Sequence, residues 1–241
     1  MGKNNGGLPC VMVASPFEGK SHIGRRLAVM LLGLFILSFG IAMSKKAGLG
    51  TAPISCIPAT LTDCVGIYTL GMWTFLFNVL LVAIEVALLG RKFPLFQFLQ
   101  LPMAFYLGFM TDVSMWILNT LGMEPVGYLQ QWLYAIAGFA VLAFGVMTEI
   151  RASLLVVPGD GLVMVLTAKV NKMPFHRMKM INDITMTAIA CVISIALVGT
   201  LTGAREGTIF AAVAIGTLLG IYRKLFGKAI DKLIGEASEF A

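Results

Sequence analysis

The amino-acid sequence predicts an all-α polytopic transmembrane helical bundle, built as two inverted three-helix repeats that each contain a broken segment. Three observations lead to this prediction: 58% of the 241 residues are hydrophobic, only 12% are charged, and one long stretch matches a later one. A soluble domain has about 45–50% apolar and about 25% charged residues. The composition therefore excludes a water-soluble globule. It also excludes a disordered chain, which needs low hydrophobicity and high net charge.

Six apolar segments are long enough to cross a bilayer, which takes about 20 helical residues. These predicted spans are rich in Leu, Val, Ile, Phe, Met and Ala and cover 27–45, 71–90, 98–118, 131–150, 179–199 and 206–223. Residues 1–26 are expected to form a cytosolic N-terminal tail. Residues 27–241 are expected to form a single transmembrane domain that ends in a short cytosolic tail.

The basic residues predict the orientation. The chain has 18 Lys and Arg against 12 Asp and Glu, a net charge of +6. With six spans and the N-terminus inside, all the basic residues except Lys45, Lys46 and Arg205 lie on the cytoplasmic side, as the positive-inside rule requires. We therefore expect a bacterial inner-membrane protein with both termini in the cytoplasm. The lipid bilayer explains the charge, and no nucleic-acid partner is predicted.

The second half of the chain repeats the first. A shift of 105 positions, the separation of Pro53 and Pro158, aligns 32–62 with 137–167 without a gap and pairs Phe39-Gly40 with Phe144-Gly145. The repeats cover about 27–120 and about 131–225. Each contains three crossings, an odd number, so the second repeat is expected to lie inverted. Inverted repeats with interrupted segments in matching positions indicate a transport site near the membrane midplane.

The interrupted segments 53–67 and 158–170 are apolar but contain Pro and Gly. Full spans, helices lying flat at the interface and re-entrant helices remain open alternatives for both. In the re-entrant arrangement, Thr51 would cap the helix that begins at Pro53, and the helix N-terminus would lie near mid-membrane. Free N–H groups and the helix dipole would favour a carboxylate there.

Several short motifs resemble the YczE/YyaS/YitT family of bacterial membrane proteins. They are GLGTAP (48–53), VPGDGL (157–162), the Asn in the following helix, and GAREGT (203–208), within a resemblance that covers roughly residues 27–225. The resemblance implies a multi-span inner-membrane protein that acts as a transporter. YitT-type members have Pro-Gly-Gly where this chain has Pro158-Gly159-Asp160, so an acidic residue replaces a glycine.

The repeats and broken segments select the candidate substrate-binding residues, which are Thr51, Pro53, Ser55, Asn78, Pro158, Gly159, Asp160 and Asn182. Ionisable residues inside spans are costly and are functional candidates by default. Asp112, Asp160 and Asp183 are the candidates for proton or ion coupling. A structural pair of Asp183 with Lys179, one turn earlier, is the competing interpretation. Glu85 is expected to snorkel or to pair with Arg91 or Lys92.

The leading functional hypothesis is a secondary transporter of a small polar organic solute, a zwitterion or organic anion, that works by alternating access. A non-transporting accessory or scaffold that binds a partner protein or a lipid is the alternative, and a channel is disfavoured by the few polar residues per span. No enzyme signature is present, and neither a cofactor nor a metal site is predicted. The small-xxx-small pattern from Gly216 to Gly220 would support a homodimer.

Overall fold

The computed structural model describes residues 22–235 except 171, 172 and 174, so most of the predicted N-terminal tail and residues 236–241 lie outside the described part. The described chain is helical, without strands. In order, the helices are α2 (Ile23–Ala47), α3 (Pro53–Val65), α4 (Leu70–Leu89), the short η1 (Gly90–Lys92) and η2 (Leu95–Leu99), α5 (Gln100–Thr120), α6 (Tyr128–Ala152), α7 (Pro158–Val170), α8 (Phe175–Val198) and α9 (Glu206–Ile234).

Six helices are long and apolar enough to cross a membrane: α2, α4, η2 with α5, α6, the Arg177–Val198 part of α8, and α9. This confirms an all-α polytopic bundle. Two helices extend well beyond the predicted spans. The first helix begins at Ile23 rather than residue 27, and the last continues to Ile234 rather than 223. The extension of α9 is held to α6 by an ion pair between Arg151 and Asp231, with a nitrogen–oxygen distance of 2.6 Å.

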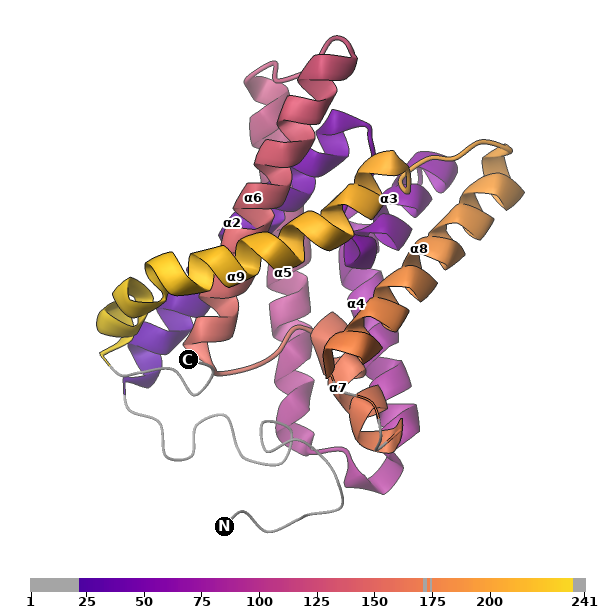
Figure 1. The fold of residues 1–241 in the computed structure, drawn as a ribbon. Coiled ribbons are helices and arrows are strands. Elements are labelled where there is room, and N and C mark those ends of the chain that lie inside the picture. Colours follow the sequence, from indigo (N-terminus) through magenta and orange to yellow (C-terminus); the bar gives the residue numbers. More distant parts are fainter. Residues whose placement is uncertain (1–21, 171–172, 174, 236–241) are drawn as a thin grey trace.

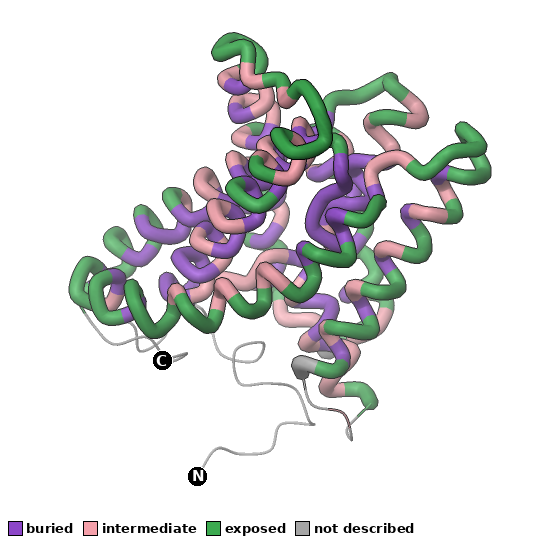
Figure 2. Tube along the Cα trace, turned by 45° about the horizontal axis from the view of Figure 1, so that its top comes forward, coloured by how far each residue is buried: buried purple, intermediate pink, exposed green. Residues whose placement is uncertain are grey.

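The centre of the bundle is the crossing of α2 with α6, which run in opposite directions (Figure 1). Glycines bring the two backbones together. A Cβ atom added at Gly40 would overlap the backbone of Leu142, and one added at Gly145 would overlap the backbone of Leu37. Small residues at helix crossings give the close packing that association in a membrane depends on. Buried residues concentrate along this crossing and around α3 (Figure 2).

The contacts of the crossing are reciprocal under the sequence shift that aligns the two repeats. The shift pairs Gly33 with Gly138 and Gly40 with Gly145. Gly33 lies against Gly145, and Gly138 lies against Gly40. Other contacts correspond in the same way: α3 packs on α8 and α4 on α7, while α2 packs on α5 and α6 on α9. Two copies related by a two-fold axis would produce this pattern.

The interrupted segments form α3 and α7, two helices of 13 residues each. Thirteen residues rise about 20 Å, short of the roughly 30 Å hydrocarbon core, so neither is a full span. Each follows a left-handed cap at equivalent positions, Gly48 with φ 72° and Ser153 with φ 54°. Their N-terminal turns are mostly buried, while Asp63 of α3 and Lys169 and Val170 of α7 are exposed near the C-terminal ends.

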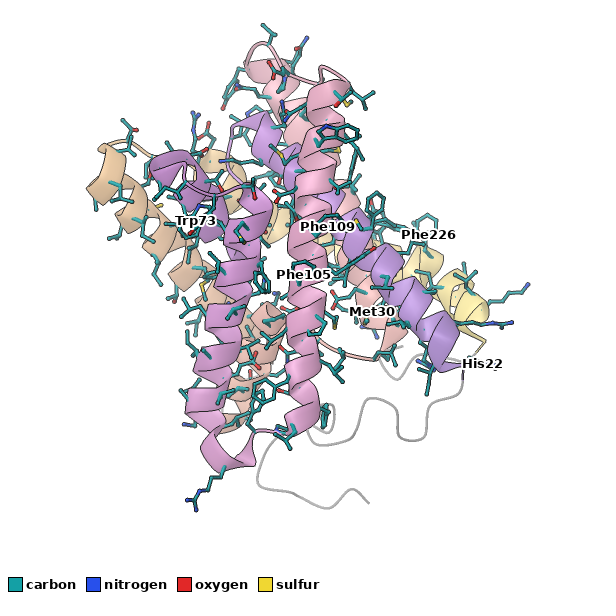
Figure 3. The ribbon with its side chains drawn as sticks, turned by 180° about the vertical axis from the view of Figure 1, so that it is seen from behind. His22, Met30, Trp73, Phe105, Phe109 and Phe226 are labelled. Atoms are coloured by element: carbon teal, nitrogen blue, oxygen red, sulfur yellow. The ribbon has the colours of Figure 1, made fainter. Side chains whose placement is uncertain are left out.

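The last helix departs from the correspondence. α4 packs along α5, whereas α8 and α9 diverge (Figure 1). Only 6% of the 18-residue apolar stretch of α9 is buried in the structure. Large apolar side chains are also exposed elsewhere, among them Phe105 and Phe109 on α5 (Figure 3). Such surfaces are typical of helices that face lipid, and they agree with a multi-pass membrane protein.

We predict that Gly40→Ala lowers the free energy of unfolding by about 1–3 kcal/mol, because the new methyl group must push α2 and α6 apart. Gly216→Ala on α9 is the matched control, since a Cβ there has no neighbour within 4 Å. Thermal unfolding of the two purified variants in detergent checks this. Equal melting temperatures would contradict the proposed role of the crossing.

Candidate functional site

Side chains of five other helices approach the first turn of α7, Pro158–Gly161. A Cβ at Gly159 would overlap the side chain of Ile54 on α3. A Cβ at Gly161 would lie 2.5 Å from Oε1 of Glu85 on α4 and 3.5 Å from Nε2 of Gln100 on α5. Asp160 forms an ion pair with α8 and interacts electrostatically with Glu149 of α6. The absence of side chains at the two glycines therefore permits this convergence.

The N-termini of the two half-length helices touch each other. Ile54 is the second residue of α3 and Gly159 the second residue of α7, and the two positions are equivalent in the repeats. The positive ends of two helix dipoles therefore meet inside the protein. Pro53 and Pro158, which begin these helices, are both buried. The structure thus brings together the two segments that the sequence singled out.

A charged cluster lies beside the first turn of α7. Lys179 donates to Asp160 with a nitrogen–oxygen distance of 2.6 Å. Asp183 and Glu149 also interact electrostatically with this lysine. The direct partner of Lys179 is thus Asp160, rather than the Asp183 expected from helical spacing. Three carboxylates face one ammonium group, and one oxygen of Glu149 and one of Asp183 have no hydrogen-bond partner among the described residues. The cluster therefore favours an added proton or cation.

Glu85 lies in a second polar group on the other side of α7. The expectation that Glu85 snorkels or pairs with Arg91 is wrong, because its side chain is fully buried (0% exposed) while Arg91 is exposed. The side chain of Lys92 lies outside the described part. The amide nitrogen of Gln100 lies 3.5 Å from one carboxylate oxygen of Glu85. The missing side chain of Gly161 gives Glu85 its space.

The other predicted binding residues have mixed surroundings. Thr51 does not cap α3, whose N-cap is Ala52 without a side-chain hydrogen bond. The backbone N–H of Thr51 instead donates to the carbonyl of Gly203, and its buried hydroxyl has no partner in the described part of the chain. Asn78 donates to the carbonyl of Thr74, four residues earlier in its helix, at 2.8 Å. The side-chain nitrogen of Asn182, in contrast, is buried without a partner there. Ser55 is buried in the first turn of α3.

Asp112 lies at a different place. Its carboxylate accepts a hydrogen bond from the hydroxyl of Thr69 at 2.6 Å and another from the backbone N–H of Gly71 at 2.8 Å. These bonds cap the start of α4 from the neighbouring α5. The carboxylate thus satisfies the N–H of Gly71, which would otherwise lack a partner in the first turn of α4. The structure therefore separates Asp112 from the groups around α7.

The GLGTAP and GAREGT segments meet and close one end of the bundle. The N–H of Gly207 donates to the carbonyl of Leu49 at 2.8 Å, and the guanidinium of Arg205 donates to the carbonyl of Gly48 at 3.1 Å. The hydrogen bond from Thr51 to Gly203 adds a third contact. The loop after α2 and the start of α9 are therefore joined through their backbones.

The equivalent segments of the other half are not joined by backbone hydrogen bonds in the described part of the chain. The stretch after α6, Leu154–Val156, lines a pocket together with Gln97 of η2, Gln100 at the start of α5 and Gly161 of α7. Within the described residues no backbone hydrogen bond joins Leu154–Val156 to the start of α5. The pocket has a volume of about 10 Å³, which is at the lower limit for one water molecule.

Five polar residues of the site were not selected as functional from the sequence: Glu85, Gln97, Gln100, Glu149 and Lys179. Among the residues that the structure describes, no group of three or more His, Cys, Asp or Glu side chains is arranged to hold a metal ion.

Residues 24–224 match a family of unknown function, DUF6198. The chain belongs to this family. It is also similar to the uncharacterized protein YyaS of Bacillus subtilis (strain 168), with 30% identity over 136 residues. The matched region covers 56% of this chain and 65% of YyaS, so the chain spans less than two thirds of that relative. These matches confirm the YyaS-like resemblance. No solved structure matches the chain.

We predict that Lys179→Met lowers the free energy of unfolding by about 1–2 kcal/mol, because it leaves Asp160 without its cation at a partly buried position. Adding Asp160→Asn should restore part of that loss, which gives a coupling energy of about 1 kcal/mol in a double-mutant cycle. Lys46→Met is the control, since its partner Glu124 is largely exposed and the pair is worth little. Strictly additive effects of the two substitutions would contradict the pairing.

Proposed function

We propose that this protein is a secondary transporter of a small polar organic solute, either a zwitterion or an organic anion. The observation that carries the proposal is the meeting of two half-length helices at their N-termini, beside a cluster of partly buried charged side chains. Interrupted helices whose positive ends converge are used by transporters to hold the anionic groups of substrates. The solute carboxylate would bind where Pro53 and Pro158 begin α3 and α7.

The proposal includes an inverted relation between the two repeats. The reciprocal contacts of Gly33 with Gly145 and of Gly40 with Gly138 support it, as does the contact between the equivalent residues Ile54 and Gly159. An axis between such equivalent pairs would run through the middle of the protein. Alternating access then requires only that the two halves exchange their closed and open ends around this centre.

The difference between the two ends supports this mechanism. The end at Gly48–Thr51 is joined to α9 by backbone hydrogen bonds, while its counterpart at Leu154–Val156 retains a pocket. That pocket is too small for an organic solute, so the structure would correspond to a nearly occluded state. We expect solute to enter when α7 separates from the start of α5.

Polar groups without partners in the described chain supply the proposed solute contacts. The side-chain amide nitrogen of Asn182 and the hydroxyl of Thr51 are both buried without a hydrogen-bond partner among the described residues. Each can therefore donate a hydrogen bond to a solute. Lys179 offers a positive charge that Asp160 occupies in this structure. An incoming carboxylate would compete with Asp160 for Lys179, and a proton taken up by Asp160 would favour that exchange.

The orientation belongs to the same proposal. The ends of α4 and α6 and the start of α8 lie at the end of the molecule where the described chain begins (Figure 1). This end carries Arg25, Arg91 and Arg151, whereas Lys45, Lys46 and Arg205 lie at the other. We infer that the basic end faces the bacterial cytoplasm. The polar cluster around α7 would then open toward the cytoplasm.

A non-transporting accessory protein is the second candidate, and the surface of α9 favours it. A Cβ atom added at Gly216 or Gly220 on this helix would have no neighbour within 4 Å among the described residues, so another helix can approach closely there. A second copy of this chain or a partner membrane protein would fit such a surface. This candidate requires no solute site at α7.

The transport proposal is tested with purified protein in liposomes. A panel of amino acids and organic acids is first screened for thermal stabilisation, where a ligand at one hundred times its Kd adds about 2.7 kcal/mol. Uptake of a stabilising solute is then measured under an imposed pH gradient. We predict that uptake requires the protein and falls at least tenfold in Asn182→Ala. An accessory protein would give neither stabilisation nor uptake.

The coupling role of Asp160 gives a separate prediction. Asp160→Asn should leave solute binding measurable but make uptake independent of the pH gradient, because the carboxylate that exchanges the proton is gone. Asp112→Asn is the comparison, since Asp112 caps α4 and should leave the pH dependence intact. The reverse result, with pH dependence lost only in Asp112→Asn, would overturn this assignment.

A further inference from the structure

Gln97 of η2 and Gln100 of α5 line the pocket at the first turn of α7, and Glu85 of α4 lies next to Gly161, which lines the same pocket. All three side chains are almost completely buried, with exposed fractions of 0%, 4% and 2%. Each has a side-chain oxygen, Oε1, without a hydrogen-bond partner among the described residues. A Cβ atom added at Gly161 would lie 2.5 Å from the free oxygen of Glu85, so this oxygen occupies the space that the missing side chain leaves. Three buried acceptor oxygens, two on side chains that line the pocket and one beside Gly161, therefore have no donor within the described chain.

From this arrangement we infer that the pocket is a binding site for a monovalent cation, Na⁺, held by oxygens of Glu85, Gln97 and Gln100. Hard cations prefer carboxylate and carbonyl oxygens, which are the groups found here. One carboxylate balances one positive charge, whereas a divalent ion would leave a buried excess charge, which is costly. The volume of about 10 Å³ admits a species of the size of water and excludes an organic cation.

The backbone around the pocket suits the same ligand. Leu154–Val156 forms the opposite wall and is not helical, so its carbonyl groups lie outside the hydrogen-bond ladders of α6 and α7. Unwound backbone of this kind coordinates Na⁺ in transporters built from inverted repeats. The site thus combines side-chain oxygens from one side with non-helical backbone on the other.

The other repeat provides an internal comparison. At the start of α9 a built-in cation, the guanidinium of Arg205, donates to the carbonyl of Gly48 and helps join α9 to the loop after α2. At the start of α5 the chain has Gln100, a neutral side chain whose oxygen has no partner in the described part. In the second half the positive charge belongs to the Arg205 side chain. In the first half a cation bound from solution would take its place beside Gln100. Na⁺ would then join α5 to the α6–α7 stretch.

Binding of Na⁺ does not depend on the transport proposal, although a coupling role for the ion would. The test is the melting temperature of the purified full chain in NaCl, compared with N-methyl-D-glucamine chloride at equal ionic strength. We expect the melting temperature to rise by about 3–6 °C for each tenfold increase in Na⁺ above its Kd. Equal melting temperatures in both salts would overturn the inference and assign the pocket to a water molecule.

Substitutions locate the effect. Glu85→Gln keeps the shape of the side chain but removes its charge, so the dependence on Na⁺ should disappear. If that variant does not fold, Gln97→Leu should still shift the Na⁺ midpoint at least tenfold upward by removing one oxygen. Glu124→Gln, at an exposed carboxylate, should leave the midpoint unchanged. A loss of the Na⁺ effect in Glu149→Gln but not in Glu85→Gln would place the ion in the charged cluster and overturn this site.

A proton is the remaining competitor for the three oxygens. If Glu85 is protonated instead of binding Na⁺, stability will depend on pH in wild type but not on Na⁺ at any pH, and the inference is overturned. Failure of Na⁺ binding leaves the transport proposal standing, because solute uptake is measured separately. Conversely, Na⁺-dependent stability without solute uptake would support the ion site and contradict transport.

Discussion

The packing of the first turn of α7 is the constraint on which the rest of the structure depends. Two glycines there carry no side chain, so Ile54 of α3 can approach from one side and Glu85 of α4 from another. Between them Asp160 reaches Lys179. A side chain at either glycine would separate the two half-length helices or displace a buried carboxylate. The convergence of helix N-termini, carboxylates and a lysine in an apolar protein thus follows from two missing side chains.

The two halves share a framework but differ in chemistry. The glycine crossing of α2 with α6, the left-handed caps at Gly48 and Ser153 and the start of each short helix at a proline correspond between them. The charges do not correspond, since Asp160 has Ser55 as its equivalent and Glu149 has Ser44. One half therefore closes through backbone hydrogen bonds, while the other gathers ionisable groups.

Much of the framework was predictable because hydropathy, proline and glycine act locally. Six apolar runs predicted six long helices, and the matched prolines marked the two interrupted segments, whose form as full spans, interfacial helices or re-entrant helices the sequence leaves open. The functional cluster was less accessible, since it depends on which helix faces meet. Glu85 was expected to reach solvent because basic residues follow it in the sequence. Only the packing of α4 on α7 shows that it points inward, toward Gly161. Asp112 had the same sequence signal as Asp160, yet it caps a neighbouring helix.

The central claim is that the site at α7 is reached from one side of the membrane at a time. Its most direct test is labelling of Asn182→Cys and Thr51→Cys with a membrane-impermeant maleimide, in a chain whose native cysteines are replaced by alanine. We expect Asn182→Cys to react from the cytoplasmic side while Thr51→Cys is protected from the outside. Adding Arg205→Ala, which weakens the outer contact, should expose Thr51→Cys and protect Asn182→Cys. If Arg205→Ala changes the labelling of only one of the two cysteines, alternating access is contradicted. It is also contradicted if neither cysteine is labelled from either side.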